Sequence, residues 1–363
     1  MNTINDIKNV LNAKYFERES EIEAILTAII ARQHILLIGP AGTGKSALSA
    51  ELKNIVTGSN YFQWLLTRFS TPEELFGVVS LKEFESGIYN RNTLGKLPEA
   101  HFAFIDEIFK ANSAILNSLL TLINERLFYN NGAPFKSPLM SIIGSSNEYP
   151  EEGEGLEPLF DRFLLRFEVE YIKDDDNFIN MLIGGQNQKT PSITLDELVQ
   201  YQFFADMVNI PIGVYRTLAD IRKYLRDEGI RPSDRRFKQS LSLLKAKAFI
   251  LGRQEVQISD ILLLKHSLWE TVDQKDITVQ IVTENAQDKV TLLLQQRQKE
   301  VLELVELGKS DNTDTKIESR RKLLAIEKEI SNIKTDNNNP LIGDLLKIIM
   351  KASGEIQESV LGF

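Results

Sequence analysis

Directly after the apolar run Ile35-Leu36-Leu37-Ile38 comes Gly39-Pro40-Ala41-Gly42-Thr43-Gly44-Lys45-Ser46. This segment fits the pattern G-x-x-x-x-G-K-[S/T], in which glycines let backbone N–H groups turn inward around phosphate oxygens without a Cβ in the way. A helix that begins near Gly44 points its positive end at the same phosphates. The segment therefore predicts a strand, a phosphate-binding loop and a helix.

A second motif, Phe102-Ala103-Phe104-Ile105-Asp106-Glu107, has the pattern of a buried strand that ends in two carboxylates. Lys45 would neutralise charge on the β- and γ-phosphates, and Ser46 would hold one coordination position of Mg²⁺. Asp106 would hold the coordination shell of Mg²⁺ together with Ser46. Glu107 would polarise the attacking water. A tight turn or a solvated strand end explains either motif alone, but the two together predict Mg²⁺-dependent ATP hydrolysis.

The composition is that of a globular protein, with 363 residues, 26% charged and 42% hydrophobic. A formal charge of −9 argues against a general nucleic-acid surface, although the basic segment Arg231 to Lys238 could make local contacts. There is no cysteine, so disulfides and thiolate zinc sites are excluded. The N-terminus lacks the pattern of a signal peptide, and no apolar stretch is long enough to span a membrane. We expect a soluble, cytoplasmic protein.

Strand and helix patterns alternate in the first part of the chain, which predicts a parallel sheet covered on both faces, an α/β fold. The predicted strands are 35–38, 61–66, 102–105 and 139–145, and the predicted helices are 22–31, 47–56 and 114–125. From about Asp196 the pattern is helical, with a third lid helix starting near Ile258. We expect an αβα core over 1–190, a small all-α lid over 196–276 and a helical appendage over 280–363.

The appendage carries Leu323, Ile326, Ile330 and Ile333 at the spacing of a coiled-coil seam. A polar turn over 308–315 predicts an antiparallel helical hairpin, and Leu345 to Met350 predicts a further helix. These helices either bind a partner or brace the lid.

These patterns resemble those of the AAA+ ATPases and, within them, the MoxR family. The residues in the motifs are most similar to those of the RavA branch. The resemblance covers about residues 10 to 270. Its most specific segments are Tyr15-Phe16-Glu17-Arg18, Thr67-Arg68-Phe69-Ser70-Thr71-Pro72-Glu73-Glu74-Leu75-Phe76-Gly77, Leu97-Pro98-Glu99-Ala100, Ile123-Asn124-Glu125-Arg126 and Ser233-Asp234-Arg235-Arg236-Phe237.

The resemblance implies roles for individual residues. Asn147, which follows the strand 139–145, resembles the sensor 1 residue that orients the water, although it could simply end that strand. Arg162 resembles the arginine finger given to a neighbouring subunit's ATP, although it could instead pair with Asp161 or Glu157 on a surface, and Arg166 is its competitor. Arg235 resembles the sensor 2 arginine of the lid, a role that Arg236 or Arg231 could take instead. Nucleotide-binding residues implied by the resemblance are Tyr15, Phe16 and the loop Gly39, Pro40, Ala41, Gly42, Thr43, Gly44, Lys45, Ser46 and Ala47.

The resemblance further implies a homo-oligomeric ring, most often a hexamer, with two inserts that face its pore. These are Gly77 to Leu97 and the hairpin at Leu127 to Gly132, where Asn131-Gly132 is a strong turn signal. The resemblance also implies the function of the ring. It would be a chaperone-like remodelling or metal-insertion machine that acts on a protein client together with a von Willebrand factor A (vWA) domain partner. The small β-rich domain of the RavA branch is missing here. Alternatives are a nucleic-acid-dependent motor and, less favoured, a nucleotide-locked scaffold.

Overall fold

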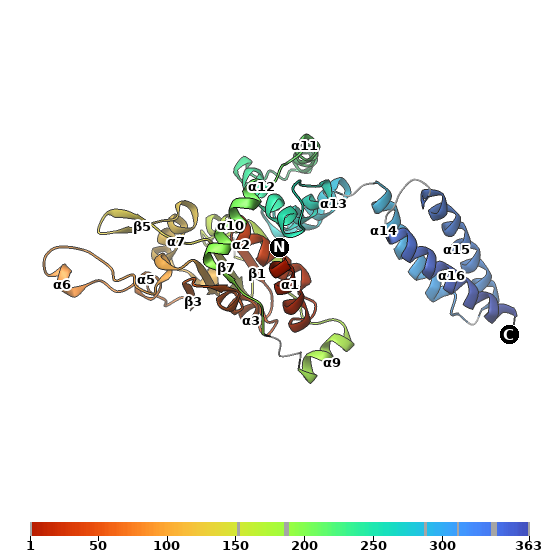
Figure 1. Ribbon diagram of the computed structural model, residues 1–363, viewed down its shortest axis with the longest axis horizontal. Coiled ribbons are helices and arrows are strands. Elements are labelled where there is room, and N and C mark those ends of the chain that lie inside the picture. Colours follow the sequence, from red (N-terminus) through yellow and green to blue (C-terminus); the bar gives the residue numbers. More distant parts are fainter. Residues whose placement is uncertain are drawn as a thin grey trace. The chain divides into compact units, whose positions relative to one another are not determined.

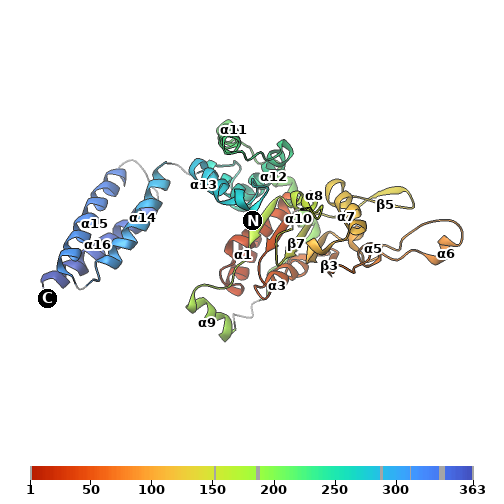
Figure 2. The same cartoon turned by 180° about the vertical axis from the view of Figure 1, so that it is seen from behind.

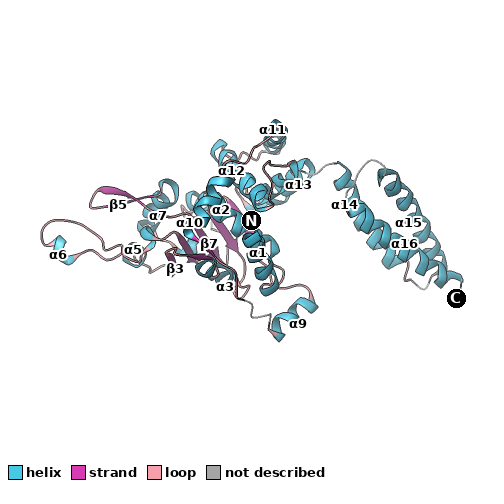
Figure 3. Cartoon of the chain, in the orientation of Figure 1, coloured by secondary structure: helices cyan, strands magenta, loops and turns pink. Residues whose placement is uncertain are grey.

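A five-stranded sheet with the strand order β3-β4-β7-β1-β8 forms the centre of the first part of the chain. Every neighbouring pair runs parallel, which confirms the predicted α/β fold (Figure 3). The strands are β1 (Ile35–Ile38), β3 (Tyr61–Leu65), β4 (Phe102–Asp106), β7 (Ser141–Ser146) and β8 (Leu165–Glu168). The sequence pattern did not single out β8, because Arg166 interrupts its apolar run.

The computed structural model describes residues 2–150, 153–184, 189–286, 289–310, 312–334 and 340–361. The chain divides into two units, Met1–Val282 and Thr283–Phe363 (Figure 1). Each unit has its own buried core, so each is described by itself.

Helices cover both faces of the sheet in the first unit. Helices α7 (Ser113–Glu125) and α8 (Glu157–Arg162) share one buried apolar cluster with alternate sheet residues such as Leu36 and Ile105. Helices α2 (Glu19–Ala31) and α3 (Lys45–Ala50) contact the sheet as well, and α1 (Asn2–Lys14) packs on α2. The carboxyl ends of the strands stay open between these layers, where ligands bind in such sheets.

The chain after the glycine-rich loop differs from the expected continuous helix over 47–56. It forms two short helices, α3 and α4 (Leu52–Ile55), and then a short strand β2 (Val56–Thr57). Strand β2 pairs in parallel with β9 (Ile193–Thr194), and the Thr57 hydroxyl donates to the Ile193 carbonyl at 3.3 Å. The predicted helix over 47–56 was wrong at its C-terminal end. There the β-branched residues of β2 pair with β9, which is distant in the sequence.

Two excursions leave the sheet between its strands. The first follows α5 (Pro72–Phe76), contains α6 (Leu81–Phe84) and returns at η1 (Leu97–Glu99). The second follows η2 (Ile108–Lys110) and α7 and is an antiparallel hairpin, β5 (Leu127–Asn130) and β6 (Ala133–Lys136). Its turn residues Asn131 and Gly132 have φ of 50° and 74°, which confirms the predicted turn.

The remaining elements of the first unit are helical. They are α9 (Asp175–Ile183), α10 (Leu195–Asp206), α11 (Ile212–Asp227), α12 (Asp234–Ile250), η3 (Ile258–His266), η4 (Val272–Gln274) and α13 (Lys275–Ala286), the last of which reaches into the second unit. Helices α10 and α12 pack against α2. The third lid helix begins at Ile258 as expected, but it is a 3₁₀ helix.

The second unit contains α14 (Lys289–Leu307), α15 (Thr313–Lys334) and α16 (Pro340–Leu361). All three contribute to one apolar core, including Leu294, Ile326 and Ile349. The expected third helix at Leu345 to Met350 is therefore longer and completes a three-helix bundle rather than following a two-helix hairpin. In the described residues, no helix combines the length and apolar character needed to cross a membrane.

Candidate nucleotide-binding site

The glycine-rich loop joins β1 to α3 at the carboxyl edge of the sheet. Its first residue, Gly39, donates its backbone N–H to the Ser146 carbonyl at 3.0 Å, and a Cβ there would lie 2.1 Å from the Val169 carbonyl oxygen. Gly42 and Gly44 have φ of 82° and 85°, in the left-handed region that favours glycine. The loop therefore has the tight backbone that a phosphate cradle needs.

Lys45 places a nearly buried ammonium in this loop. Its Nζ donates to the Gly39 and Pro40 carbonyls at 2.6 and 2.8 Å and lies 3.4 Å from Asn147 Oδ1. Burial lowers the pKa of Lys45, and the charges of Asp106 and Glu107 oppose that shift. Within the described residues, the hydrogen bonds of Nζ go to carbonyl, hydroxyl and amide oxygens and to no carboxylate, so a bound anion would supply a direct counter-charge.

Ser46 and Asp106 face one another beside the loop. The Ser46 hydroxyl lies 3.4 Å from Asp106 Oδ2, while Asp106 Oδ1 accepts from the Ser145 hydroxyl and from the Glu107 N–H at 3.1 Å. Mg²⁺ in phosphate-transfer sites keeps several waters and takes only one or two protein oxygens besides the phosphates. A hydroxyl and a carboxylate in this position fit that donor set.

Glu107 follows β4 in a left-handed conformation, with φ of 52°, which is uncommon for a residue with a side chain. Its carboxylate accepts a hydrogen bond from the Asn147 side-chain amide. Burial and then the charge of Asp106 raise the pKa of Glu107, as suits a group that polarises water. Asn147 thus contacts both Lys45 and Glu107, an arrangement that a mere strand end would not require.

A pocket of about 420 Å³ lies beside the loop. It is lined by Gly42, Thr43 and Gly44, by the predicted Tyr15 and Phe16, and by Lys14, Arg18, Tyr171, Ile172, Phe178 and Met181. Aromatic and aliphatic walls next to a phosphate loop suit the base of a nucleotide. The sequence motifs did not indicate the contribution from 171–181, because those residues reach the loop only through the fold.

Three side chains, those of Tyr171, Arg18 and Glu17, tie the segment 170–177 to the pocket. Tyr171 donates its hydroxyl to the Ala41 carbonyl at 3.2 Å, and Arg18 donates to the carbonyls of Thr43, at 3.3 Å, and Glu170. The Glu17 carboxylate accepts from the backbone N–H groups of Lys173 and Asp174, both at 2.9 Å. These bonds lower the pKa of Glu17 and hold the start of α9 beside the loop.

The arginines predicted to act on ATP lie together in a different place. Arg162 ends α8 and pairs with Asp161 at 2.5 Å, and Asp161 also binds Arg236 at 2.7 Å. Arg235 donates to Asn124 Oδ1 at 2.9 Å, and burial together with the charge of Arg162 lowers its pKa. The structure therefore brings Arg162 and Arg235 into one cluster.

This cluster is separated from the glycine-rich loop of the same chain. Asn124 lies near the end of α7, whose 13 residues span roughly 20 Å. Two residues further along the chain, Arg126 donates to the Arg32 carbonyl at 3.0 Å and to His34. Both acceptors lie just before the start of β1. The end of α7 therefore lies at the amino edge of the sheet, opposite Lys45.

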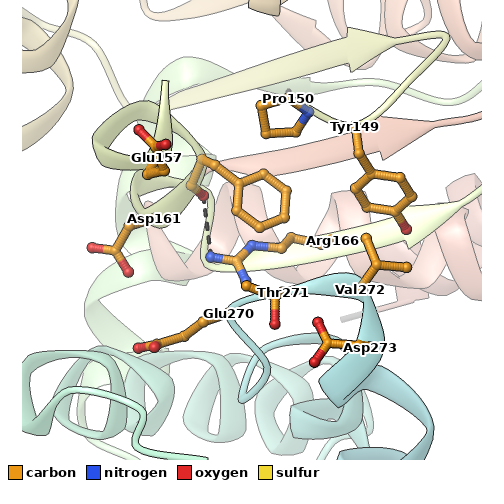
Figure 4. A pocket seen from close by; sticks show the side chains of 10 residues that line it. Tyr149, Pro150, Glu157, Asp161, Arg166, Glu270, Thr271, Val272 and Asp273 are labelled. Carbon is orange, nitrogen blue, oxygen red and sulfur yellow. Dashed lines mark hydrogen bonds between the residues drawn. The ribbon is translucent and has the colours of Figure 1, made fainter. Parts of the chain in front are cut away.

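Arg166 is a buried structural residue, which contradicts its candidacy as the arginine finger. It is 1% exposed and donates to the carbonyls of Phe163 at 3.2 Å, Phe160 at 3.1 Å and Trp269. Its guanidinium lies over the Phe160 ring at 4.0 Å, against a pocket of about 500 Å³ (Figure 4). A guanidinium held this way cannot reach a neighbouring subunit.

Arg236 is likewise a poor substitute for Arg235, because it is 2% exposed and donates to the Ser267 carbonyl at 2.8 Å as well as to Asp161. Arg231 is exposed and stays an alternative.

Comparison with known proteins places this architecture in a family. Residues 2–206 match the family described as the MoxR domain in the MoxR-vWA-beta-propeller ternary systems, and this match covers more than half of the 363 residues. The chain belongs to the MoxR family. Residues 213–282 match an AAA lid domain, so this MoxR-family protein is of the AAA+ ATPase type.

Several relatives share most of the chain. The uncharacterized proteins MJ0079 and MJ0812 of Methanocaldococcus jannaschii are 39% and 40% identical over 78% and 74% of this chain, and the matches cover 74% and 72% of their lengths. A putative ATPase from Cytophaga hutchinsonii has a similar fold, with a TM-score of 0.61 and 18% identity over 78% of this chain and 94% of its own.

The base pocket gives a first prediction for this MoxR-family protein. Replacing Phe178 by alanine should weaken Mg²⁺–ATP binding about fivefold, because a half-buried aromatic wall contributes roughly 1 kcal/mol. Binding of inorganic tripolyphosphate, which has no base, should be unchanged in calorimetry. Leu182 on the same helix is 66% exposed and does not line the pocket, so Leu182→Ala is the matched control. Equal losses for both ligands would place Phe178 outside the base site.

Proposed function

We propose that this MoxR-family AAA+ protein hydrolyses ATP with Mg²⁺. The observation that carries the proposal is the gathering of five side chains around one loop: Lys45, Ser46, Asp106, Glu107 and Asn147. Lys45 would balance the β- and γ-phosphates, and Ser46 with Asp106 would hold Mg²⁺, which stabilises charge on the transferring phosphoryl group. Glu107 would polarise the attacking water, with Asn147 orienting it.

The active form in this proposal is a ring, most often a hexamer in such proteins. Arg162 and Arg235 lie together and apart from the chain's own glycine-rich loop. We propose that both act on the ATP of a neighbouring subunit, Arg162 as the arginine finger and Arg235 as the sensor 2 arginine. An isolated chain would then be a poor ATPase, because each site is completed by a second copy.

The work done by the ring, in our proposal, is remodelling of a protein client or promotion of metal insertion in the cytoplasm. The matched family is described by its association with vWA and β-propeller proteins, which supports a vWA protein as partner. Membership of the RavA branch remains a prediction from the residues of the motifs. We therefore infer no partner from that branch.

A nucleic-acid-dependent motor is the alternative, and the insert at Gly77 to Leu97 disfavours it. Of its basic residues, Arg91 pairs with Glu73 at 3.0 Å, and Lys96 donates to the Glu74 carbonyl at 3.0 Å. Lys82 is exposed but lies beside Glu83 and Glu85. A surface with so little free positive charge gains little from phosphate contacts.

ATP turnover in the presence of two polymers tests the proposal. We expect a permanently unfolded polypeptide, reduced and carboxymethylated α-lactalbumin, to stimulate turnover, and single-stranded DNA to have no effect. Stimulation by DNA that falls steeply with added salt would favour the motor instead. Glu107→Gln is the background control, because an amide is nearly isosteric but cannot polarise water.

A further inference from the structure

The insert and the hairpin project from the same side of the first unit, near α6 and β5 (Figures 1 and 2). We define the insert as residues 77–97 and the hairpin as residues 127–136. They are separated in sequence by β4 and α7. In the sequence they are two separate segments, but in the structure hydrogen bonds join them.

The side-chain amide of Asn130, at the end of β5, makes the central contact. Its Oδ1 accepts the backbone N–H of Arg91 at 2.7 Å, and its Nδ2 donates to the Arg91 carbonyl at 3.0 Å. An amide that both accepts from and donates to one residue replaces the backbone of a neighbouring strand. Next to it, Asn131 Oδ1 accepts from the Tyr89 N–H at 3.2 Å.

Arg91 in turn fixes the base of the insert. Its backbone lies in an antiparallel bridge with Val79, flanked by Ser80 N–H to Asn90 O and Asn92 N–H to Val78 O, both at 2.8 Å. Its guanidinium donates to Glu73 on α5 at 3.0 Å and to the Gly77 carbonyl at 2.8 Å. One residue of the insert therefore connects α5, the insert and the hairpin.

Beyond this base, the tip of the insert carries exposed apolar side chains. Leu81, Phe84 and Tyr89 are 77%, 57% and 47% exposed, and the rings of Phe84 and Tyr89 meet edge to face. On the hairpin, Tyr129 is 54% exposed. Exposed apolar groups on a fixed support mark contact surfaces for other proteins, and the scarcity of free positive charge on the insert disfavours a nucleic-acid partner.

We propose that Asn130 is a positioning residue that joins the insert and the hairpin into one unit that contacts an unfolded, apolar polypeptide. This inference rests on the proposed remodelling function. The hairpin leads through β7 to Asn147, so the unit is attached to the strand that ends beside Lys45 and Glu107. A polypeptide held by the unit would act on the nucleotide site through that strand.

Amide hydrogen exchange tests the hydrogen bonds between Asn130 and Arg91 independently of ATP turnover. In Asn130→Ala the Arg91 amide should exchange roughly tenfold faster, because it loses its acceptor. The Asn92 amide, which donates within the insert, should change less. Asn130→Asp retains the acceptor and should restore protection of the Arg91 amide. The matched control is Asn92→Ala, because the Asn92 side chain accepts from the Leu94 N–H within the insert, at 3.3 Å, and has no bond to the hairpin among the described residues.

Turnover with carboxymethylated α-lactalbumin tests the consequence. Asn130→Ala should lose most of the stimulation seen in the wild type and require a higher polypeptide concentration for the remainder, whereas Asn92→Ala should be stimulated normally. Unchanged Arg91 exchange, or full stimulation despite faster exchange, would overturn the role of Asn130. Absence of stimulation in the wild type would overturn the polypeptide partner and the remodelling function instead, which separates the two failures.

Discussion

Replacing Arg162 by alanine should lower ATP turnover by about 10³- to 10⁵-fold, the usual contribution of an arginine that stabilises charge on the transferring phosphoryl group. Nucleotide binding should be nearly unchanged, because the glycine-rich loop and Lys45 of each chain would still hold the phosphates, whereas an arginine finger acts mainly on the transition state. The fold should persist, since Asp161 keeps its contact with Arg236 at 2.7 Å. Turnover and nucleotide affinity measured on the same preparation check both parts of this expectation.

Mixing variants shows whether Arg162 acts on a neighbouring subunit. Arg162→Ala and Glu107→Gln should each be nearly inactive as homogeneous rings. When subunits exchange, some interfaces combine an intact Glu107 with an intact Arg162 from the next chain, and these should hydrolyse ATP. Activity above the sum of the separate variants is the expected result. Demonstrated co-assembly without recovery would argue against action in trans, and Arg166 could not take over because it is buried.

Replacing Lys45 by alanine should nearly abolish ATP binding. The variant removes the cation placed to balance the β- and γ-phosphates, and the loss of charged hydrogen bonds costs roughly 3 kcal/mol, or about a hundredfold or more in Kd. Calorimetry with Mg²⁺–ATP measures this directly.

Lys53→Ala provides the control for this variant, because Lys53 is exposed on the nearby helix α4. It should bind ATP as the wild type does. Near-normal affinity in Lys45→Ala would show that the loop does not hold the phosphates. An equal loss in Lys53→Ala would point to a general effect of removing positive charge near the site.

Much of the candidate site could be predicted because its residues follow strands directly. Gly39 to Ser46 continues β1, Asp106 ends β4 with Glu107 next to it, and Asn147 follows β7. The carboxyl ends of parallel strands meet at one edge of a sheet, so three separate segments converge there once the sheet is recognised. The sequence could not predict the strand β8, because the buried Arg166 there donates to the carbonyls of Phe160 in α8, of Phe163 just after α8 and of the distant residue Trp269.

What the sequence by itself determined is the chemistry that contiguous residues can carry: the glycine loop with Lys45, the acidic pair and the Asn131-Gly132 turn. Each depends on backbone conformations and spacings within a few residues. Only the tertiary structure decided that Phe178 and Met181 complete a pocket at the loop, that Arg162 and Arg235 form one cluster away from it, and that Asn130 binds Arg91. These contacts join segments far apart in the chain, so they arise from packing rather than from any local pattern.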